Sequence, residues 1–376
     1  MNDHRNASVE IDRAAMSDLV DLLRENGYRV IGPTVREGAI VLADLESADQ
    51  LPWGWGVEVG PGTYRLRRRD DGAAFGHSTG PQSWKQYLLP SREKLWEADR
   101  ADGFVPVEPV RERPRYAFLG VRPCDLRSIQ ILDRVLTGGR HTDENYASRR
   151  YDLFTVVVEC TEPGDVCFCA SMGTGPHAGP GFDLAMVELT GANRHVFVAT
   201  AGSDRGAEVL ASLPQRPAGA SLEAAARSAV DDAANRMGRA MPDTDLHRLL
   251  ADNRDSARWD DVAERCLSCA NCTLVCPTCF CTSTEEVTDL SGDHTERWQR
   301  WDSCFDLQYS YIHGGSVRAS PRSRYRQWIS HKLSTWYDQF DSSGCVGCGR
   351  CIAWCPVGID ITAEATALHA DEEAPS

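Results

Sequence analysis

Cys266-Leu267-Ser268-Cys269-Ala270-Asn271-Cys272-Thr273-Leu274-Val275-Cys276-Pro277 recurs near the C-terminus as Cys345-Val346-Gly347-Cys348-Gly349-Arg350-Cys351-Ile352-Ala353-Trp354-Cys355-Pro356. Both runs have the spacing Cys-x2-Cys-x2-Cys-x3-Cys-Pro. A cubane [4Fe–4S] cluster is held by four thiolates, and in this spacing the first three cysteines of a run bind one cluster while the fourth binds the other. The repeated run therefore predicts two clusters whose ligand sets are crossed.

The crossed arrangement assigns each cysteine of the two runs to one cluster. Cluster A takes Cys266, Cys269, Cys272 and Cys355, and cluster B takes Cys345, Cys348, Cys351 and Cys276. Zinc is the alternative metal, because zinc ribbons also bind their metal through Cys-x2-Cys pairs. Two complete copies of the longer run favour iron–sulfur clusters over a zinc-binding structural or interaction protein.

Length and charge exclude several classes of protein. The chain has 376 residues, enough for two or three domains, and a formal net charge of −15, which argues against nucleic acid or an anionic membrane as partner. Its N-terminus has no secretory signal pattern, and no apolar stretch is long enough for a membrane span. Fifteen cysteines, an odd number, fit thiolate metal ligands better than a disulfide framework. We expect a cytoplasmic protein.

A β-α-β unit precedes the cysteine runs. Residues 116–121 and 153–158 have the composition of buried strands, and residues 126–136 have the apolar spacing of a helix. We expect Arg122-Pro123-Cys124 to form a turn and Asp125 to cap the helix. Cys124 and Cys160 then follow the C-terminal ends of two parallel strands, the edge at which open α/β sheets bind ligands.

Cys167 and Cys169 lie in the loop that follows, so four thiols converge on one region. They are either the ligands of a third cluster, Cys124, Cys160, Cys167 and Cys169, or buried core thiols. The glycine-rich run 173–181 lacks the strand–Gly-x-Gly-x-x-Gly–helix order of a dinucleotide site, which favours a tight loop over a cluster.

Other elements follow from periodicity and turn residues. Helices are predicted over residues 12–25, 221–237 and 255–264, the second of these with a serine N-cap. A further helix is predicted to begin near Trp84 and to have Leu95 and Trp96 on its buried face. Strands are predicted over residues 28–31, 39–45 and 63–66, and a hairpin around residues 191–193. The acidic end of the chain, beyond His369, is predicted to be disordered.

A long insertion, residues 282–344, separates the two cysteine runs. It contains a basic aromatic segment, which either neutralises reduced clusters, docks an acidic partner, or is a solvated helix face with core aromatics. Cys279, Cys281 and Cys304 in and beside the insertion are either inert thiols beside cluster B or include a ligand.

The ordered motifs resemble those of a known family: the iron–sulfur beta subunit of soluble NAD(P)-linked [NiFe] hydrogenases, or sulfhydrogenases, to which one of the subunits of anaerobic sulfite reductase is related. The resemblance spans residues 110–362 and is weaker before them. The motifs that carry it are Gly120-Val121-Arg122-Pro123-Cys124-Asp125, Cys167-Phe168-Cys169, Cys276-Pro277-Thr278-Cys279-Phe280-Cys281, Arg300-Trp301-Asp302-Ser303-Cys304, His331-Lys332 and Cys345-Val346-Gly347-Cys348-Gly349-Arg350-Cys351.

This resemblance implies an electron-transfer subunit of a hetero-oligomeric oxidoreductase. Its implied partners are the small and large subunits of a [NiFe] hydrogenase and a flavin- and NAD(P)-binding subunit. The alternative is electron delivery to an anaerobic sulfite reductase. The sequence contains no Ser/His/Asp constellation, no paired-carboxylate site and no nicotinamide fingerprint, so we expect no active site of its own and no cofactor other than the clusters.

The predicted fold class combines α/β and α+β architecture, with a mixed-sheet N-terminal body and a C-terminal, helical, bacterial-ferredoxin-like module for two [4Fe–4S] clusters. The predicted division is residues 1–110, an N-terminal α+β region; residues 111–240, an α/β domain with the extra cysteines; residues 241–365, the dicluster module with its insertion; and residues 366–376, an acidic tail.

Overall fold

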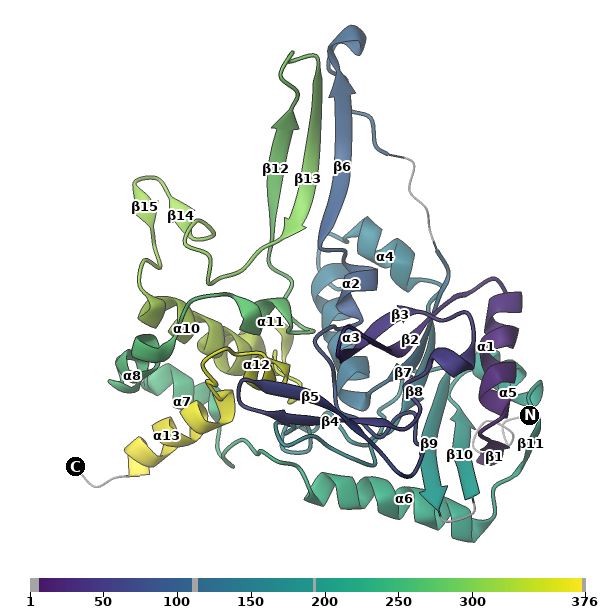
Figure 1. Ribbon diagram of the computed structural model, residues 1–376. Helices are drawn as coiled ribbons and strands as arrows, with labels where there is room; N and C mark the ends of the chain where they lie inside the picture. Colours follow the sequence, from purple (N-terminus) through teal and green to yellow (C-terminus); the bar gives the residue numbers. More distant parts are fainter. Residues whose placement is uncertain (1–6, 110–113, 192–193, 374–376) are drawn as a thin grey trace.

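The computed structural model describes residues 7–109, 114–191 and 194–373 (Figure 1). Its elements fall into a sheet-based body, a helical body that carries the cysteine runs, and two projections. None of the helices in the described residues has the length and hydropathy of a membrane-spanning segment.

An eight-stranded mixed sheet organises the first body. Its central strands β2, β7, β8 and β9 are parallel, and the strands at both edges pair antiparallel. In spatial order the strands are β11 (Gln215–Pro217), β1 (Val9–Asp12), β10 (Arg194–Ala201), β9 (Leu184–Gly191), β8 (Phe154–Val158), β7 (Tyr116–Val121), β2 (Arg29–Arg36) and β3 (Ala39–Asp44). The sheet thus joins strands from residues 1–110 with strands from residues 111–240 in a single core.

Helices cover both faces of this sheet. On one face, α1 (Ala15–Glu25) and α5 (Asp204–Ala211) pack over alternate residues of the parallel strands. On the other face lie α3 (Pro123–Thr137), α4 (Glu144–Arg150) and α6 (Ala220–Asn235). Burial on both faces explains why β7 and β8 are continuous apolar runs.

The helical body surrounds the cysteine runs. Its elements are α7 (Leu246–Asp252), α8 (Arg258–Arg265), α9 (Asn271–Leu274), α10 (Pro321–Ser330), the π-helical turn η3 (His331–Thr335), α11 (Trp336–Phe340), α12 (Arg350–Ala353) and α13 (Ile361–Glu373). The hairpin of β4 (Trp55–Gly60) and β5 (Thr63–Arg68) packs against this body, with the rings of Tyr64 and Trp354 5.2 Å apart. Residues from the N-terminal region therefore complete the core around the second cysteine run.

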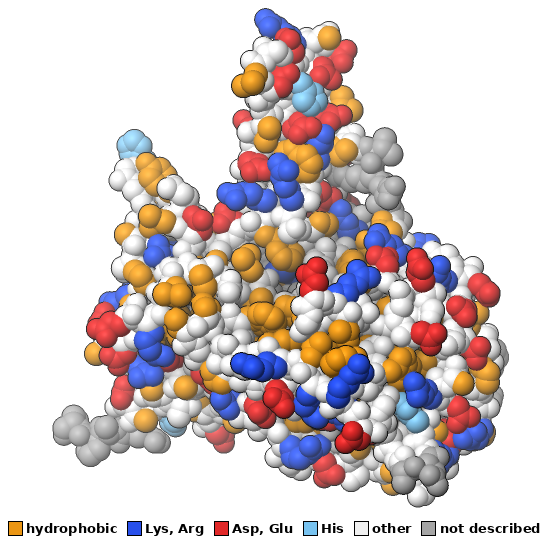
Figure 2. Space-filling view, viewed as in Figure 1, with side chains coloured by type: hydrophobic (Ala, Val, Ile, Leu, Met, Phe, Trp, Pro, Cys, Tyr) orange, Lys and Arg blue, Asp and Glu red, His pale blue; other side chains and the backbone are white. Residues whose placement is uncertain are grey.

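Two projections rise from the body (Figures 1 and 2). The larger is a three-stranded antiparallel sheet of β12 (Thr282–Thr288), β13 (His294–Trp301) and β6 (Arg92–Asp99). The smaller is the hairpin of β14 (Tyr311–Ile312) and β15 (Gly315–Ser316). Short 3-10 turns, η1 (Ala48–Gln50) and η2 (Arg100–Asp102), lie in the connecting segments.

The insertion is thus not a single helical segment. Its basic aromatic part forms α10, in which Tyr325, Trp328 and Ile329 are buried. Arg322 and Arg326 form ion pairs with Asp260 and Asp255 of the same chain. This arrangement favours the interpretation of a helix with core aromatics and arginines neutralised within the chain.

Most predicted elements of the sheet body are confirmed. These are the helix α1, the strands β2, β3, β5, β7 and β8, the parallel pairing of β7 with β8, and the hairpin β9–β10. Two residues of that hairpin's turn, Ala192 and Asn193, lie outside the described residues. The helix predicted from residue 255 is α8.

The prediction for the segment after Trp84 is wrong. Helix α2 (Lys85–Leu88) is a single turn, and Leu95 and Trp96 lie in strand β6. Strand β6 pairs with β13, which is distant in sequence. Strand formation there depends on this partner, and local periodicity carries no information about it.

Three predicted helix boundaries are also wrong. Helix α3 begins at Pro123, with Arg122 extended at the N-cap position, so Arg122-Pro123-Cys124 is not a separate turn and Asp125 is not the cap. Proline is favoured at the first helical position because its missing N–H has no partner there. Helix α6 has Gly219 rather than a serine at its N-cap. Helix α13 continues to Glu373, so residues 370–373 are helical and not disordered.

Candidate metal centres

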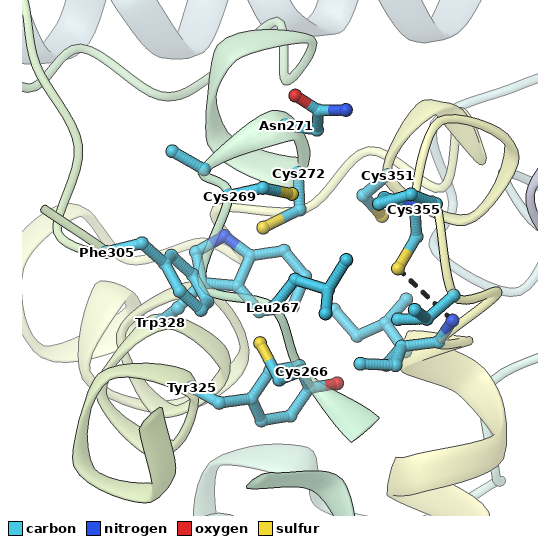
Figure 3. A pocket seen from close by; sticks show the side chains of 15 residues that line it. Cys266, Leu267, Cys269, Asn271, Cys272, Phe305, Tyr325, Trp328, Cys351 and Cys355 are labelled. Carbon is cyan, nitrogen blue, oxygen red and sulfur yellow. Dashed lines mark hydrogen bonds between the residues drawn. The ribbon is translucent and has the colours of Figure 1, made fainter. Parts of the chain in front are cut away.

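The first cysteine run lines an apolar pocket in the helical body. Helix α8 ends at Arg265 and leads directly into Cys266, and positive φ angles at Ser268 and Ala270 fold the run back on itself. Cys266, Cys269 and Cys272 line the pocket together with Cys351 and Cys355 of the second run. Figure 3 shows Cys266, Cys269, Cys272 and Cys355 around one space, bordered by Phe305, Tyr325 and Trp328. All four cysteines predicted for cluster A are therefore adjacent.

The donor set of this pocket fits a thiolate-bound cluster. The backbone N–H of Ser268 donates to Cys266 Sγ at 3.4 Å, and the N–H of Ile359 donates to Cys355 Sγ at 3.3 Å. Such bonds stabilise sulfur in its anionic form. Burial raises the pKa of Cys272 well above its ordinary value. A bound metal would keep so buried a thiol deprotonated.

The cysteines predicted for cluster B form a second group. Burial raises the pKa of Cys351, and the neighbouring thiols of Cys345, Cys348 and Cys276 raise it further. Burial likewise raises the pKa of Cys345 to about 12, although the N–H of Gly347 donates to its Sγ at 3.5 Å. Cys276 of the first run therefore lies beside the three cysteines of the second, as crossed ligation requires.

The four cysteines of the sheet body converge at one site. Cys124 is in the first turn of α3, Cys160 follows β8, and Cys167 and Cys169 lie in the next loop. Burial raises the pKa of Cys169, and the nearby thiols of Cys160, Cys167 and Cys348 add to the effect. Burial has the same effect on the pKa of Cys124, with Cys169, Cys348 and Cys160 nearby.

The glycine-rich run closes over this site. A Cβ atom at Gly175 would lie 3.1 Å from Cys169 Sγ, so the loop passes close to the thiol and a side chain here would be crowded. The backbone N–H of Cys160 donates to the carbonyl of Pro176 at 3.4 Å. This packing supports the interpretation of a tight loop over a metal centre.

The loop of Cys167 and Cys169 is joined to the loop of cluster B. The N–H of Phe168 donates to Gly347 O at 2.9 Å, and Thr174 Oγ1 donates to Val346 O at 2.7 Å. Thr79 Oγ1 donates to Cys348 O at 3.1 Å. The two cysteine loops are therefore joined by hydrogen bonds although they are far apart in the sequence.

Gly347 makes this contact possible, and its replacement by alanine tests it. A Cβ atom at Gly347 would lie 2.6 Å from the backbone N and Cα of Cys169, and its φ is +66°. We expect Gly347→Ala to lower the free energy of unfolding by more than the about 1–2 kcal/mol that the left-handed conformation alone costs a non-glycine residue. Guanidinium chloride unfolding, followed by tryptophan fluorescence, measures this difference.

Gly72→Ala is the matched control. Gly72 has a φ of +69°, and nothing lies within 4 Å of the added Cβ, so this variant carries the conformational penalty without the collision. If Gly347→Ala and Gly72→Ala lowered the free energy of unfolding equally, the close packing of the Gly347 loop against the Cys169 loop would be contradicted.

A buried ion pair, not predicted from the sequence, links the same two loops. Arg350, between Cys348 and Cys351, donates through Nη1 and Nη2 to the carboxylate of Asp125 at 2.7 and 3.0 Å. Both side chains are only 3% exposed. The Nε of Arg350 also lies 3.2 Å from Gly80 O and 3.1 Å from Gln82 O. The pair joins the first turn of α3, which carries Cys124, to the second cysteine run.

The three remaining cysteines lie in different surroundings. A hydrogen bond from Cys279 and the ammonium of Lys332 hold the pKa of Cys276 well below its ordinary value despite burial, and the same bond raises the pKa of Cys279. Burial raises the pKa of Cys304 to about 12, and this thiol lies near both Cys272 and Lys332. Cys281 is close to Cys304.

Comparison with known proteins agrees with this arrangement. The family model of the 4Fe-4S dicluster domain matches residues 265–359. The chain is similar to sulfhydrogenase 2 subunit beta of Pyrococcus furiosus, with 29% identity over 294 residues that cover 73% of this chain and 79% of that protein. No solved structure gives a significant match. The predicted similarity to a sulfhydrogenase beta subunit is therefore confirmed, as is the combination of a mixed α/β body with a dicluster domain.

Proposed function

From the 4Fe-4S dicluster domain and the similarity to a sulfhydrogenase beta subunit, we propose that this chain is an electron-transfer subunit. It relays electrons between a flavin protein that binds NAD(P) and a [NiFe] hydrogenase module. The observation that carries the proposal is the arrangement of twelve cysteines in three adjacent groups. Eleven of them are buried or half-buried, and Cys269 is exposed.

The three groups follow one another in a row. The Cys124 group contacts the cluster B loop, because Cys348 lies near both Cys124 and Cys169. The cluster B loop in turn contacts the cluster A pocket, because Cys351 lines that pocket and lies near Cys272. We assign Cys124, Cys160, Cys167 and Cys169 to a third cluster at the start of this row.

The residues of the chain hold and insulate these centres. When bound, [4Fe–4S] clusters supply one-electron transfer without making or breaking bonds in a substrate. Phe305, Tyr325 and Trp328 exclude water from one side of the cluster A pocket. The backbone N–H groups on the sulfurs of Cys266, Cys345 and Cys355 orient and stabilise the ligands.

Cluster A lies closest to the surface in this proposal. Cys269 is exposed, and next to it Leu267 is 64% exposed. Leu274 and Val357, from the first run and just past the second, are also exposed. An apolar rim around a ligand cysteine is a suitable contact for a redox partner, so we place one partner protein here.

The test is purification of the native complex through this chain. We expect nickel, flavin and hydrogen-dependent reduction of NAD(P) in that complex, and loss of the reduction in Cys272→Ser, which removes a predicted ligand of cluster A. A complex without nickel and without hydrogen turnover would overturn the proposal. A sirohaem partner and sulfite-dependent NADH oxidation would identify electron delivery to a sulfite reductase. A colourless, zinc-containing protein would indicate a structural role.

A further inference from the structure

Lysine is rare in this chain, and its positions are unusual. Lysine and arginine together number 40, but Lys85, Lys94 and Lys332 are its only lysines. Lys85 and Lys332 are buried, with exposures of 3% and 2%. Lysine is almost never fully buried unless it is paired. Both ammonium groups reach one short segment, Cys276–Cys279.

Lys332 reaches the sulfur of Cys276 through a hydroxyl group. Its Nζ donates to Thr278 Oγ1 at 2.8 Å and to Gly344 O at 3.2 Å. Thr278 is fully buried, and its Oγ1 lies 3.2 Å from Cys276 Sγ and 2.6 Å from Gly344 O. The Thr278 hydroxyl donates to Gly344 O, so the ammonium group of Lys332 and the sulfur of Cys276 both lie against the same hydroxyl oxygen.

Lys85 approaches the same segment from the sheet body. Its Nζ donates to Cys276 O at 3.1 Å and to Cys279 O at 2.9 Å, and it lies 3.9 Å from the ring centre of Trp301. Two carbonyl oxygens and an aromatic face are favourable partners for an ammonium ion.

Neither lysine is neutralised by an acidic side chain within the described residues: the hydrogen bonds of both ammonium groups go to carbonyls and a hydroxyl. Apart from Lys94, the other basic side chains counted among the 40 lysines and arginines are arginines. Lysine provides a compact point charge with three donors, whereas the planar guanidinium group of arginine needs a wider site. The two lysines therefore place concentrated positive charge where the fourth ligand of cluster B is expected.

We propose that Lys332 and Lys85 are positioning residues that raise the reduction potential of the metal centre bound through Cys276. This inference rests on the proposed ligand set of cluster B. One-electron reduction changes a cubane with four thiolate ligands from a dianion to a trianion. Nearby positive charge stabilises the trianion more than the dianion, because the attraction grows with the charge of the cluster.

The experiment is an EPR-monitored titration of the full chain with dithionite, in the variants Lys332→Gln and Lys85→Gln. Each cluster gives one reduction wave in this titration. We expect the same single wave to move to lower potential in both variants. The expected shift is at least about 59 mV, which corresponds to a tenfold change in a one-electron equilibrium constant. The other waves should stay in place. Thr278→Val, which keeps the charge of Lys332 but removes the hydroxyl group, should move that wave by less.

Lys94→Gln is the matched control. Lys94 forms ion pairs with Glu97 and Glu296 on the projecting sheet, so its replacement removes the same charge from the chain without changing the surroundings of Cys276. No wave should move in this variant.

Iron and labile sulfide are measured first, which separates this inference from the proposed function. A wild-type chain without iron–sulfur clusters would contradict the proposed function itself. If the clusters are present and both glutamine variants keep their iron but show unchanged potentials, the role of the lysines is overturned and the relay stands. If Lys332→Gln loses iron, the potential of Lys85→Gln is the test: an unchanged potential in a Lys85→Gln chain that keeps its iron would overturn the role of the lysines. Iron loss from both variants would also overturn the inference, because the lysines would then be structural.

Discussion

Cys124→Ser is expected to lower the iron content of the purified chain from about twelve to about eight atoms, since each cubane contains four. Cys124 lies near Cys160 and Cys169, at the start of the row of thiols. A serine hydroxyl is a poor substitute for a thiolate, and an incomplete ligand set does not retain the cluster. Colorimetric iron and labile sulfide, together with EPR of the reduced protein, measure the loss.

Cys304→Ser is the control for this prediction. Cys304 is a largely buried thiol near Cys272, but it belongs to none of the three proposed ligand sets. We expect its iron content to equal that of the wild type. If Cys124→Ser also retained all of its iron, Cys124 and Cys160 would be core thiols and the third cluster would be absent.

Arg350→Met is expected to lower the free energy of unfolding by about 3–5 kcal/mol, because it leaves the carboxylate of Asp125 buried without its partner. The loss should be visible as a lower midpoint of guanidinium chloride unfolding. Since Arg350 also bonds the carbonyls of Gly80 and Gln82, the contact between the cluster B loop and the N-terminal region should loosen in the same variant.

The double variant Asp125→Leu, Arg350→Met removes both charges and should recover much of this stability, because no unpaired ion remains buried. Arg29→Met is the surface control. Arg29 and Asp44 are paired on β2 and β3 with about half of each side chain exposed, and breaking such a pair costs about 0–1 kcal/mol. Similar losses at the two sites would contradict the importance of burial for the Arg350–Asp125 pair.

The sequence was sufficient to predict those features that depend on the spacing of residues close together in the chain. The Cys-x2-Cys-x2-Cys-x3-Cys-Pro runs predicted the dicluster domain that matches residues 265–359. Continuous apolar runs identified β7 and β8, and the positions of Cys124 and Cys160 just beyond them predicted their convergence. Such predictions depend only on strand direction and loop length, which are readable along the chain.

Local spacing failed where an element depends on a distant partner. Leu95 and Trp96 form a strand because β13 offers an edge for pairing. Asp125 resembles a helix cap, but its carboxylate is held by Arg350 of the second cysteine run. No periodic signal connects such residues, because the chain brings them together only when its core closes.

The type of ligand, its spacing and the class of chemistry can be read from the amino-acid sequence. The charges around those ligands cannot, because they depend on which distant residues folding brings to the site. Lys85 belongs to a short helix of the N-terminal region and Lys332 to the insertion, yet both ammonium groups meet at Cys276–Cys279. The physical reason is that a thiolate's identity is local, whereas its electrostatic surroundings are the sum of all charges that folding places nearby.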